Sequence, residues 1–86
     1  MTRMVTDVKA LGAALRTHRT SRGWTQAELA ENAGVSRRFV SELEAGLRTG
    51  AELSRVFAVL RALRLAVTLT DSGPESFDDA LREVLG

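Results

Sequence analysis

The sequence predicts an all-α bundle of four to five helices that carries one C-terminal strand. Apolar residues recur at helical spacing up to about residue 64, and capping residues and glycines divide this region into separate helices. An alternation of period two, which is typical of a strand, follows at residues 65–70. The length of 86 residues suits one domain with a modest core.

The first helix is expected to begin at Thr6, which can cap it, with Asp7 in its first turn. The residues that follow helical spacing after it are Val8, Leu11, Leu15 and His18. This spacing predicts that the single histidine lies on the apolar side of the helix in a structural role. Gly23 is expected to end the helix.

Two short helices are expected next, separated by Gly34. Thr25 and Glu28 form a capping box, in which the threonine hydroxyl accepts a backbone N–H and the glutamate reaches back to the cap. Ser36 is a suitable N-cap for the later helix, which Gly46 ends. The inward residues of the pair are expected to be Leu29, Ala30, Ala33, Val40 and Leu43. Helices joined by so short a turn cross steeply, which leaves the N-terminal half of the later helix exposed.

A second capping box, Thr49 with Glu52, is expected to start a fourth helix. Its apolar face is predicted to consist of Leu53, Val56, Phe57, Leu60 and Leu63. Residues 65–70 then alternate apolar with small or polar side chains, and three of them are β-branched, which favours a strand. The alternative is a continuation of the fourth helix through Leu65.

A lone strand cannot satisfy its own backbone hydrogen bonds, and no other segment of the sequence has the pattern of a partner strand. An identical strand from a second chain would solve this by forming a two-stranded sheet across a twofold axis. The sequence therefore predicts a homodimer, with Leu65, Val67 and Leu69 as the dimerisation face.

The exposed tip of the third helix has the chemistry of a segment that enters the major groove of DNA. Its exposed residues are expected to be Ser36, Arg37, Arg38, Ser41 and Glu42. An arginine can offer two donors to a guanine edge, with contact to phosphates as the alternative role. Two such tips related by a twofold axis would address palindromic half-sites about 34–36 Å apart.

Three stretches resemble the Xre family of helix-turn-helix regulators, which includes Cro and the lambda-type phage repressors: RTSRGWTQAELA at 19–30, AGVS at 33–36 and LEAG at 43–46. The resemblance covers roughly residues 6–64. It implies a lambda-repressor-like helix-turn-helix domain there. The expected dimerisation strand at 65–70 and an acidic tail at 71–86 follow this domain.

The resemblance implies that Arg37 and Arg38 contact base edges. It also implies such a contact one turn further along the helix, from Ser41 or Glu42, although both could simply face solvent. Phe39 is expected at the edge of the core, with contact to a thymine methyl group as the alternative.

Contacts to the DNA backbone are expected from Gln26 and Ser36, which stand at helix starts, with simple capping as the alternative role. Arg48, just past the third helix, is a further candidate for a phosphate contact. The resemblance also implies that Arg19 and Glu44 form a structural ion pair.

An Xre-like domain followed by RALRL at 61–65 and by the LAVTLTD segment resembles the HipB antitoxin subgroup. This implies a dimeric repressor of its own operon that binds and neutralises a HipA-type serine/threonine kinase toxin. A stand-alone Xre-family regulator without a toxin partner is the alternative. A third class, an interaction module that no longer binds DNA, is disfavoured by Arg37, Arg38 and Gln26.

Charge is unevenly distributed, because residues 1–50 hold eight Lys and Arg against five Asp and Glu, whereas residues 71–86 hold one against five. The basic part suits binding to a polyanion. The acidic tail, in which a short helix is expected from Ser76, is available to a protein partner.

No cysteine and no Gly-rich phosphate loop are present, and Asp78 and Asp79 would point apart on a helix. We therefore expect no enzyme, no metal and no cofactor. Without a signal peptide or an apolar run long enough to span a membrane, a cytoplasmic location is expected.

Overall fold

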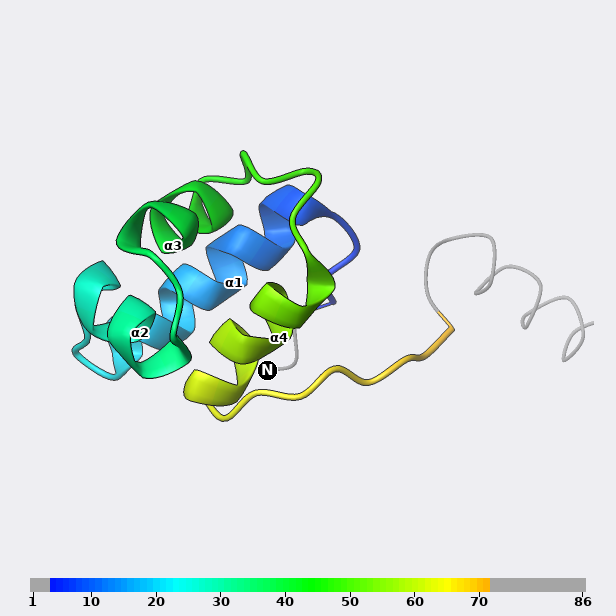
Figure 1. Ribbon diagram of the computed structural model, residues 1–86. Coiled ribbons are helices and arrows are strands. Elements are labelled where there is room, and N and C mark those ends of the chain that lie inside the picture. The colour runs from blue at the N-terminus through cyan, green and yellow to red at the C-terminus, as the bar shows by residue number, and fades with distance from the viewer. Residues whose placement is uncertain (1–3, 72–86) are drawn as a thin grey trace, which may run out of the picture.

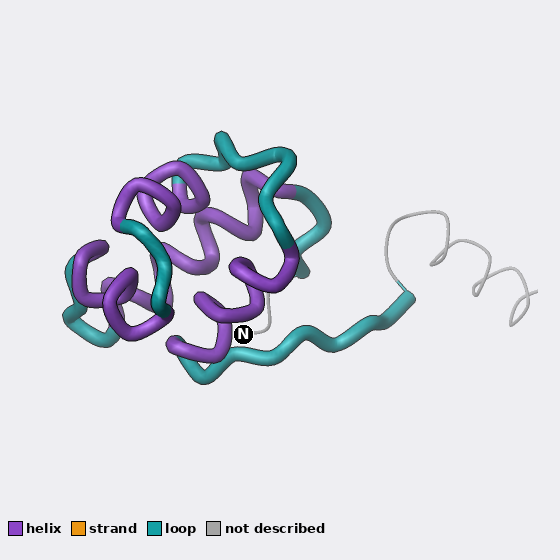
Figure 2. The backbone as a smooth tube through the Cα atoms, in the orientation of Figure 1, coloured by secondary structure: helices purple, strands orange, loops and turns teal. Residues whose placement is uncertain are grey.

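The computed structural model describes residues 4–71, which form four helices. They are α1 (Val8–Ser21), α2 (Gln26–Ala33), α3 (Arg37–Glu44) and α4 (Leu53–Ala62) (Figure 1). The third helix packs on α1 and α2, and α4 packs on α2. The part of the chain described here contains helices and loops but no strand (Figure 2), so the all-α prediction is confirmed for it. None of its helices is both long and apolar enough to cross a bilayer.

All four helices contribute to a single apolar core. The largest fully buried side chains are Leu15, Leu29, Phe39, Val40, Leu43, Val59 and Leu63. The predicted inward residues of α2 and α3 are confirmed, since Ala30 is also buried and Ala33 packs against the core. His18, in contrast, is exposed. Its expected place on the apolar side is wrong because the inward stripe of α1 continues from Leu15 to Arg19 instead.

Short polar side chains fix the starts of the first three helices. The cap of α1 is Asp7, whose Oδ1 accepts the N–H of Ala10 at 2.7 Å, and the expectation that Thr6 caps it is wrong. A carboxylate at this position also interacts favourably with the helix dipole. The predicted capping box of α2 is present, because the Thr25 hydroxyl accepts the N–H of Glu28 while Glu28 accepts the N–H of Thr25.

The start of α4 differs from the prediction. The helix begins at Leu53, its N-cap is Glu52, and no side chain caps it, so the capping box with Thr49 is wrong. Packing places Val56, Val59, Leu60 and Leu63 inward, whereas Leu53 and Phe57 are 70% and 39% exposed. The burial of this stripe at the spacing i, i+3, i+4 and i+7 outweighs the local capping signal.

The end of α4 is a sharp reversal of the backbone. The helix stops at Ala62, so its continuation through Leu65 is wrong. Arg64 takes the left-handed conformation (φ 57°), and the N–H of Leu65 donates back to the carbonyl of Leu60 at 2.8 Å. This pattern of hydrogen bonds satisfies helix carbonyls that would otherwise lack partners.

A side chain from the end of α1 reinforces this reversal. Arg22 donates from Nη2 to the carbonyl of Leu63 at 2.7 Å, and its guanidinium carbon lies 5.5 Å from the centre of the Trp24 ring. Trp24 itself packs partly buried against the core. The contact joins the end of α1 to the end of α4.

Residues 65–71 leave this point as an extended segment without a strand assignment (Figure 2). Leu65 packs against the core, whereas Val67 and Leu69 are 53% and 93% exposed. A strand needs a hydrogen-bonded neighbour, which residues 4–71 of one chain do not supply. The expected fifth helix and acidic tail lie outside the described residues.

Candidate nucleic-acid interface

A tight turn at Gly34 sets the angle between α2 and α3. Gly34 is in the left-handed conformation (φ 72°, ψ 31°), and the N–H of Val35 donates to the carbonyl of Ala30 at 3.0 Å. A Cβ at Gly34 would meet nothing within 4 Å, so the backbone conformation and not space calls for glycine. Ser36 then caps α3 by accepting the N–H of Phe39 at 3.0 Å.

The third helix has a buried face and an exposed face. Phe39, Val40 and Leu43 are buried within the core. Because Phe39 is only 1% exposed, it takes the core position and not the alternative contact with a thymine methyl group. The exposed face carries Ser36, Arg37, Arg38 and Ser41.

The two adjacent arginines at the start of α3 differ in their surroundings. Arg37 is exposed and forms no ion pair with any other residue in the range 4–71. The side chain of Arg38 is 83% exposed, and its Nε lies 3.4 Å from Oε2 of Glu42, one helical turn away. Both guanidinium groups are therefore accessible to a ligand.

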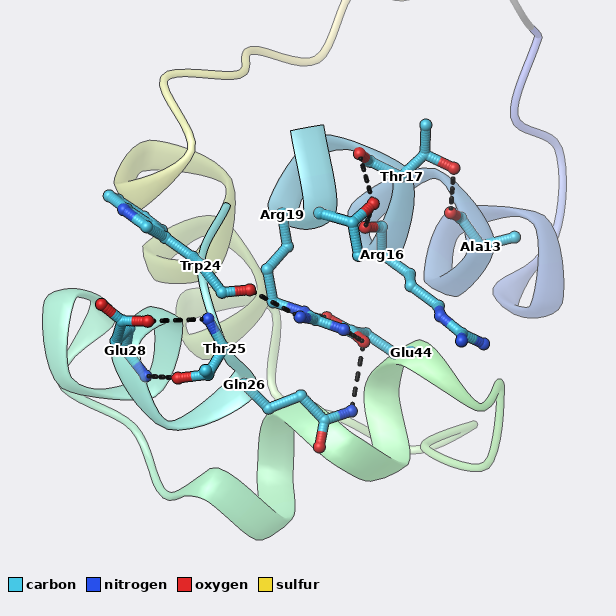
Figure 3. A network of polar contacts seen from close by, with 10 residues as sticks. Ala13, Arg16, Thr17, Arg19, Trp24, Thr25, Gln26, Glu28 and Glu44 are labelled. Atoms are coloured by element: carbon cyan, nitrogen blue, oxygen red, sulfur yellow. Dashed lines mark hydrogen bonds and ion pairs between the residues drawn. The ribbon is translucent and has the colours of Figure 1, made fainter. Parts of the chain in front are cut away.

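The C-terminal end of α3 is fixed by an ion pair, and this is the pair that the Xre resemblance implies. Arg19 donates from Nε and Nη2 to the carboxylate of Glu44 at 2.7 and 3.0 Å, and from Nη1 to the carbonyl of Trp24 at 2.7 Å (Figure 3). The side chains of Arg19 and Glu44 are only 11% and 3% exposed. The hydrogen bond to Glu44, with the negative charge of Glu44 added, raises the pKa of Arg19 above its ordinary value.

Gln26, at the first position of α2, joins the same network. Its Nε2 donates to Oε1 of Glu44 at 3.2 Å (Figure 3), and its side chain is part-buried. The capping role considered for Gln26 belongs to Thr25 instead. The amide of Gln26 thus links the start of α2 to the end of α3.

Arg48, in the loop after α3, folds back over that helix. Its Nε lies 3.0 Å from Oε1 of Glu42, and its guanidinium carbon lies 5.2 Å from the centre of the Phe39 ring. Glu42 therefore stands between two arginines, Arg38 and Arg48. The spacing of Arg38 and Glu42 signals their contact in the sequence, but no sequence signal reveals the contact with Arg48.

These charged groups are suited to binding a polyanion. Within the described range 4–71, no three His, Cys, Asp or Glu side chains lie close enough together to hold a metal ion. Two exposed arginines, Arg37 and Arg38, lie on the outer face of α3, and the partly exposed Arg48 follows in the loop after it. An exposed helix end with guanidinium groups fits the width and the acceptor pattern of the major groove.

Comparison with known proteins agrees with this geometry. The HTH_3 family, described as helix-turn-helix, matches residues 15–69. Antitoxin HipB of Escherichia coli K12 is 35% identical over 69 residues, which cover 77% of this chain and 77% of that protein. A solved structure described as a HipB-O4 20mer complex is similar, with a TM-score of 0.76, 29% identity and coverage of 84% of this chain and 100% of that one. Another, described as a HipA-HipB-O2-O3 complex, has a TM-score of 0.75 at 29% identity, with the same coverage of both chains.

Proposed function

Since the chain belongs to the HTH_3 helix-turn-helix family and to its Xre-like, HipB-type branch, we propose that it is a DNA-binding repressor that acts as an antitoxin. The observation that carries the proposal is the exposed cationic tip of α3, which Gly34 holds away from the core. The buried ion pair of Arg19 and Glu44 fixes the opposite, C-terminal end of the same helix and so keeps the helix in position.

In this proposal the N-terminal half of α3 enters the major groove of a duplex. Arg37, Arg38 and Ser41 contact base edges and so supply specificity. Contacts to the DNA backbone come from Gln26, Ser36 and Arg48. The free N–H groups at the starts of α2 and α3 add to the attraction for phosphates.

We propose that the repressor is a homodimer on a palindromic operator. Residues 65–70 of two chains pair as strands, with Leu65, Val67 and Leu69 forming the dimerisation face. The extended backbone of this segment and the exposure of Val67 and Leu69 support the pairing, because both would gain from a partner. Sedimentation across a range of concentrations tests it, and a Val67→Asp variant should shift the chain toward a monomer.

The proposed protein partner is a HipA-type serine/threonine kinase toxin, which the chain neutralises in the cytoplasm. The similarity to antitoxin HipB and to a structure described as containing both HipA and HipB supports this assignment. Residues 6–64 would form the DNA-binding domain, and residues 71–86 an acidic segment available to the toxin. An adjacent kinase-like reading frame whose product co-purifies with this chain is expected; its absence would favour a stand-alone regulator.

Mobility shift and footprinting on the DNA upstream of the chain's own gene test whether the exposed tip of α3 binds DNA. The wild type should protect a palindromic site, and the Arg37→Ala/Arg38→Ala double variant should lose that protection. Arg55→Ala is a matched control, because Arg55 is an exposed arginine on α4. Binding should weaken steeply with salt, since phosphate contacts release counterions. Equal shifts by the wild type and the double variant, or a flat salt response, would contradict the proposal.

A further inference from the structure

The carboxylate of Glu42 lies between Arg38, on the exposed side of α3, and Arg48, in the loop after it. Its Oε2 is 3.4 Å from Nε of Arg38, and its Oε1 is 3.0 Å from Nε of Arg48. The side chain of Glu42 is 29% exposed, so the ion pairs sit at the surface where DNA would approach. One acidic side chain thereby offsets part of the charge of two basic ones.

Arg48 is held by charge and by stacking. Its guanidinium carbon lies 5.2 Å from the centre of the buried Phe39 ring, a distance that suits a cation–π contact. Its Nε is buried and makes no hydrogen bond of acceptable geometry, although the carboxylate of Glu42 is only 3.0 Å away. The side chain as a whole is still 37% exposed, so Arg48 can be reached by a further acceptor.

We propose that Glu42 is a specificity-determining residue of the DNA interface. Its carboxylate holds Arg38 and Arg48 and competes with DNA phosphates for them. The inference rests on the proposed function, because it assumes that this face of α3 binds DNA. Arg37, which has no ionic partner within residues 4–71, is not restrained in this way.

The physical argument depends on the difference between the two modes of DNA binding. On non-specific DNA the arginines gain only from phosphates, so a competing carboxylate lowers affinity directly. On the operator, the two Nη groups of Arg38 can donate to a guanine edge while its Nε stays beside Glu42, so this contact does not require the ion pair to break. Glu42 therefore widens the ratio between operator affinity and non-specific affinity.

The test is the Glu42→Gln variant, which keeps the shape of the side chain and removes its charge. Affinity is measured for a duplex carrying the footprinted site and for a scrambled duplex of equal length. Affinity for scrambled DNA should rise about tenfold, as loss of one neighbouring charge near a surface permits. Affinity for the site should rise about threefold or less, so that the specificity ratio falls. Glu52→Gln is the matched control, because it removes the same charge and the ion pair of Glu52 with Arg55 on α4.

A second measurement asks whether Glu42 acts through the arginines. In the Arg38→Ala/Arg48→Ala background, Glu42→Gln should raise affinity for scrambled DNA far less than in the wild type, because only the direct repulsion between the carboxylate and the phosphates is then lost. An equal rise in that background, or an unchanged specificity ratio in the single variant, would overturn the inference. If the wild type binds no upstream DNA, the proposed function fails as well. If it binds and only the ratio fails to change, the proposed function stands without this role for Glu42.

Discussion

The two faces of α3 use the same kind of ion pair in different surroundings. On the inner side, Glu44 meets Arg19 at 2.7 Å, with both side chains nearly buried. On the outer side, Glu42 meets Arg38 at 3.4 Å, with the arginine 83% exposed. Burial makes the inner pair costly to break, whereas water screens the outer pair. The exposed side chains of α3 can therefore exchange their ion pair for contacts with a ligand, while the buried pair keeps the helix in place.

The largest effect is expected from the Glu44→Ala substitution in the inner pair. It leaves the charge of Arg19 buried without its partner and removes an acceptor for Gln26. The free energy of unfolding should fall by about 4 kcal/mol, within the range for a buried pair that loses one member. Denaturant unfolding measures this loss. The matched variant Glu42→Ala should cost less than about 1 kcal/mol, and equal losses would show that the two pairs do not differ.

The next largest effect is expected where α1 touches the end of α3. A Cβ at Gly12 would collide with the carbonyl oxygen of Leu43 and lie 2.7 Å from that of Glu44. Because backbone atoms cannot rotate away, Gly12→Ala should push the helices apart and cost about 3 kcal/mol. Thermal unfolding measures the cost. Gly50→Ala is the control, since a Cβ there meets nothing within 4 Å, and an equally small effect of both substitutions would contradict the close approach.

The outer face should respond in binding and not in stability. Arg37→Ala is expected to lose about 2 kcal/mol of discrimination between the operator and a site with one changed base pair, if Arg37 contacts a guanine. Fluorescence anisotropy on both duplexes measures this difference. The unfolding free energy should stay within about 0.5 kcal/mol of the wild type, as for other surface substitutions. A uniform loss on both duplexes would assign Arg37 to a phosphate instead.

The smallest effect is expected at Ser36, which bears both on the stability of α3 and on the proposed contact with DNA. Ser36 caps α3, and its removal in Ser36→Ala should cost about 1 kcal/mol of stability. Ser36→Asp keeps an acceptor for the N–H of Phe39 but brings a negative charge to the proposed phosphate contact. Stability should recover while DNA affinity falls. Recovery of both would remove Ser36 from the interface.

The pair of helices α2 and α3, with the turn that joins them, was predictable because its determinants are local. Thr25, Glu28, Gly34 and Ser36 act on backbone groups within a few residues of themselves, and each does so as expected. The start of α4 depends on packing. Glu52 fits the spacing of a capping box, yet its carboxylate lies 3.7 Å from Nε of Arg55 and caps nothing.

The candidate site shows the same division between local and long-range determinants. Exposure of Arg37 and Arg38 follows from helical phase, so the sequence could predict it. The contacts of Gln26 with Glu44 and of Arg48 with Glu42 depend on how helices and a loop pack, which residue spacing does not encode. The strand pairing proposed for residues 65–70 would need a second chain, and in one chain this segment is extended without a partner among residues 4–71.

The reversal at Arg64, held by the hydrogen bond from Arg22 to Leu63, determines where the extended segment departs. In Figure 1 that segment starts below α4, on the edge of the view opposite α3. A second chain that pairs with residues 65–70 near this exit would leave the arginines of α3 uncovered. The molecule would thus be held by its partner at residues 65–70 while α3 stays free to contact a duplex. Pairing at the extended segment and DNA binding at α3 would then be independent, because neither covers the other surface.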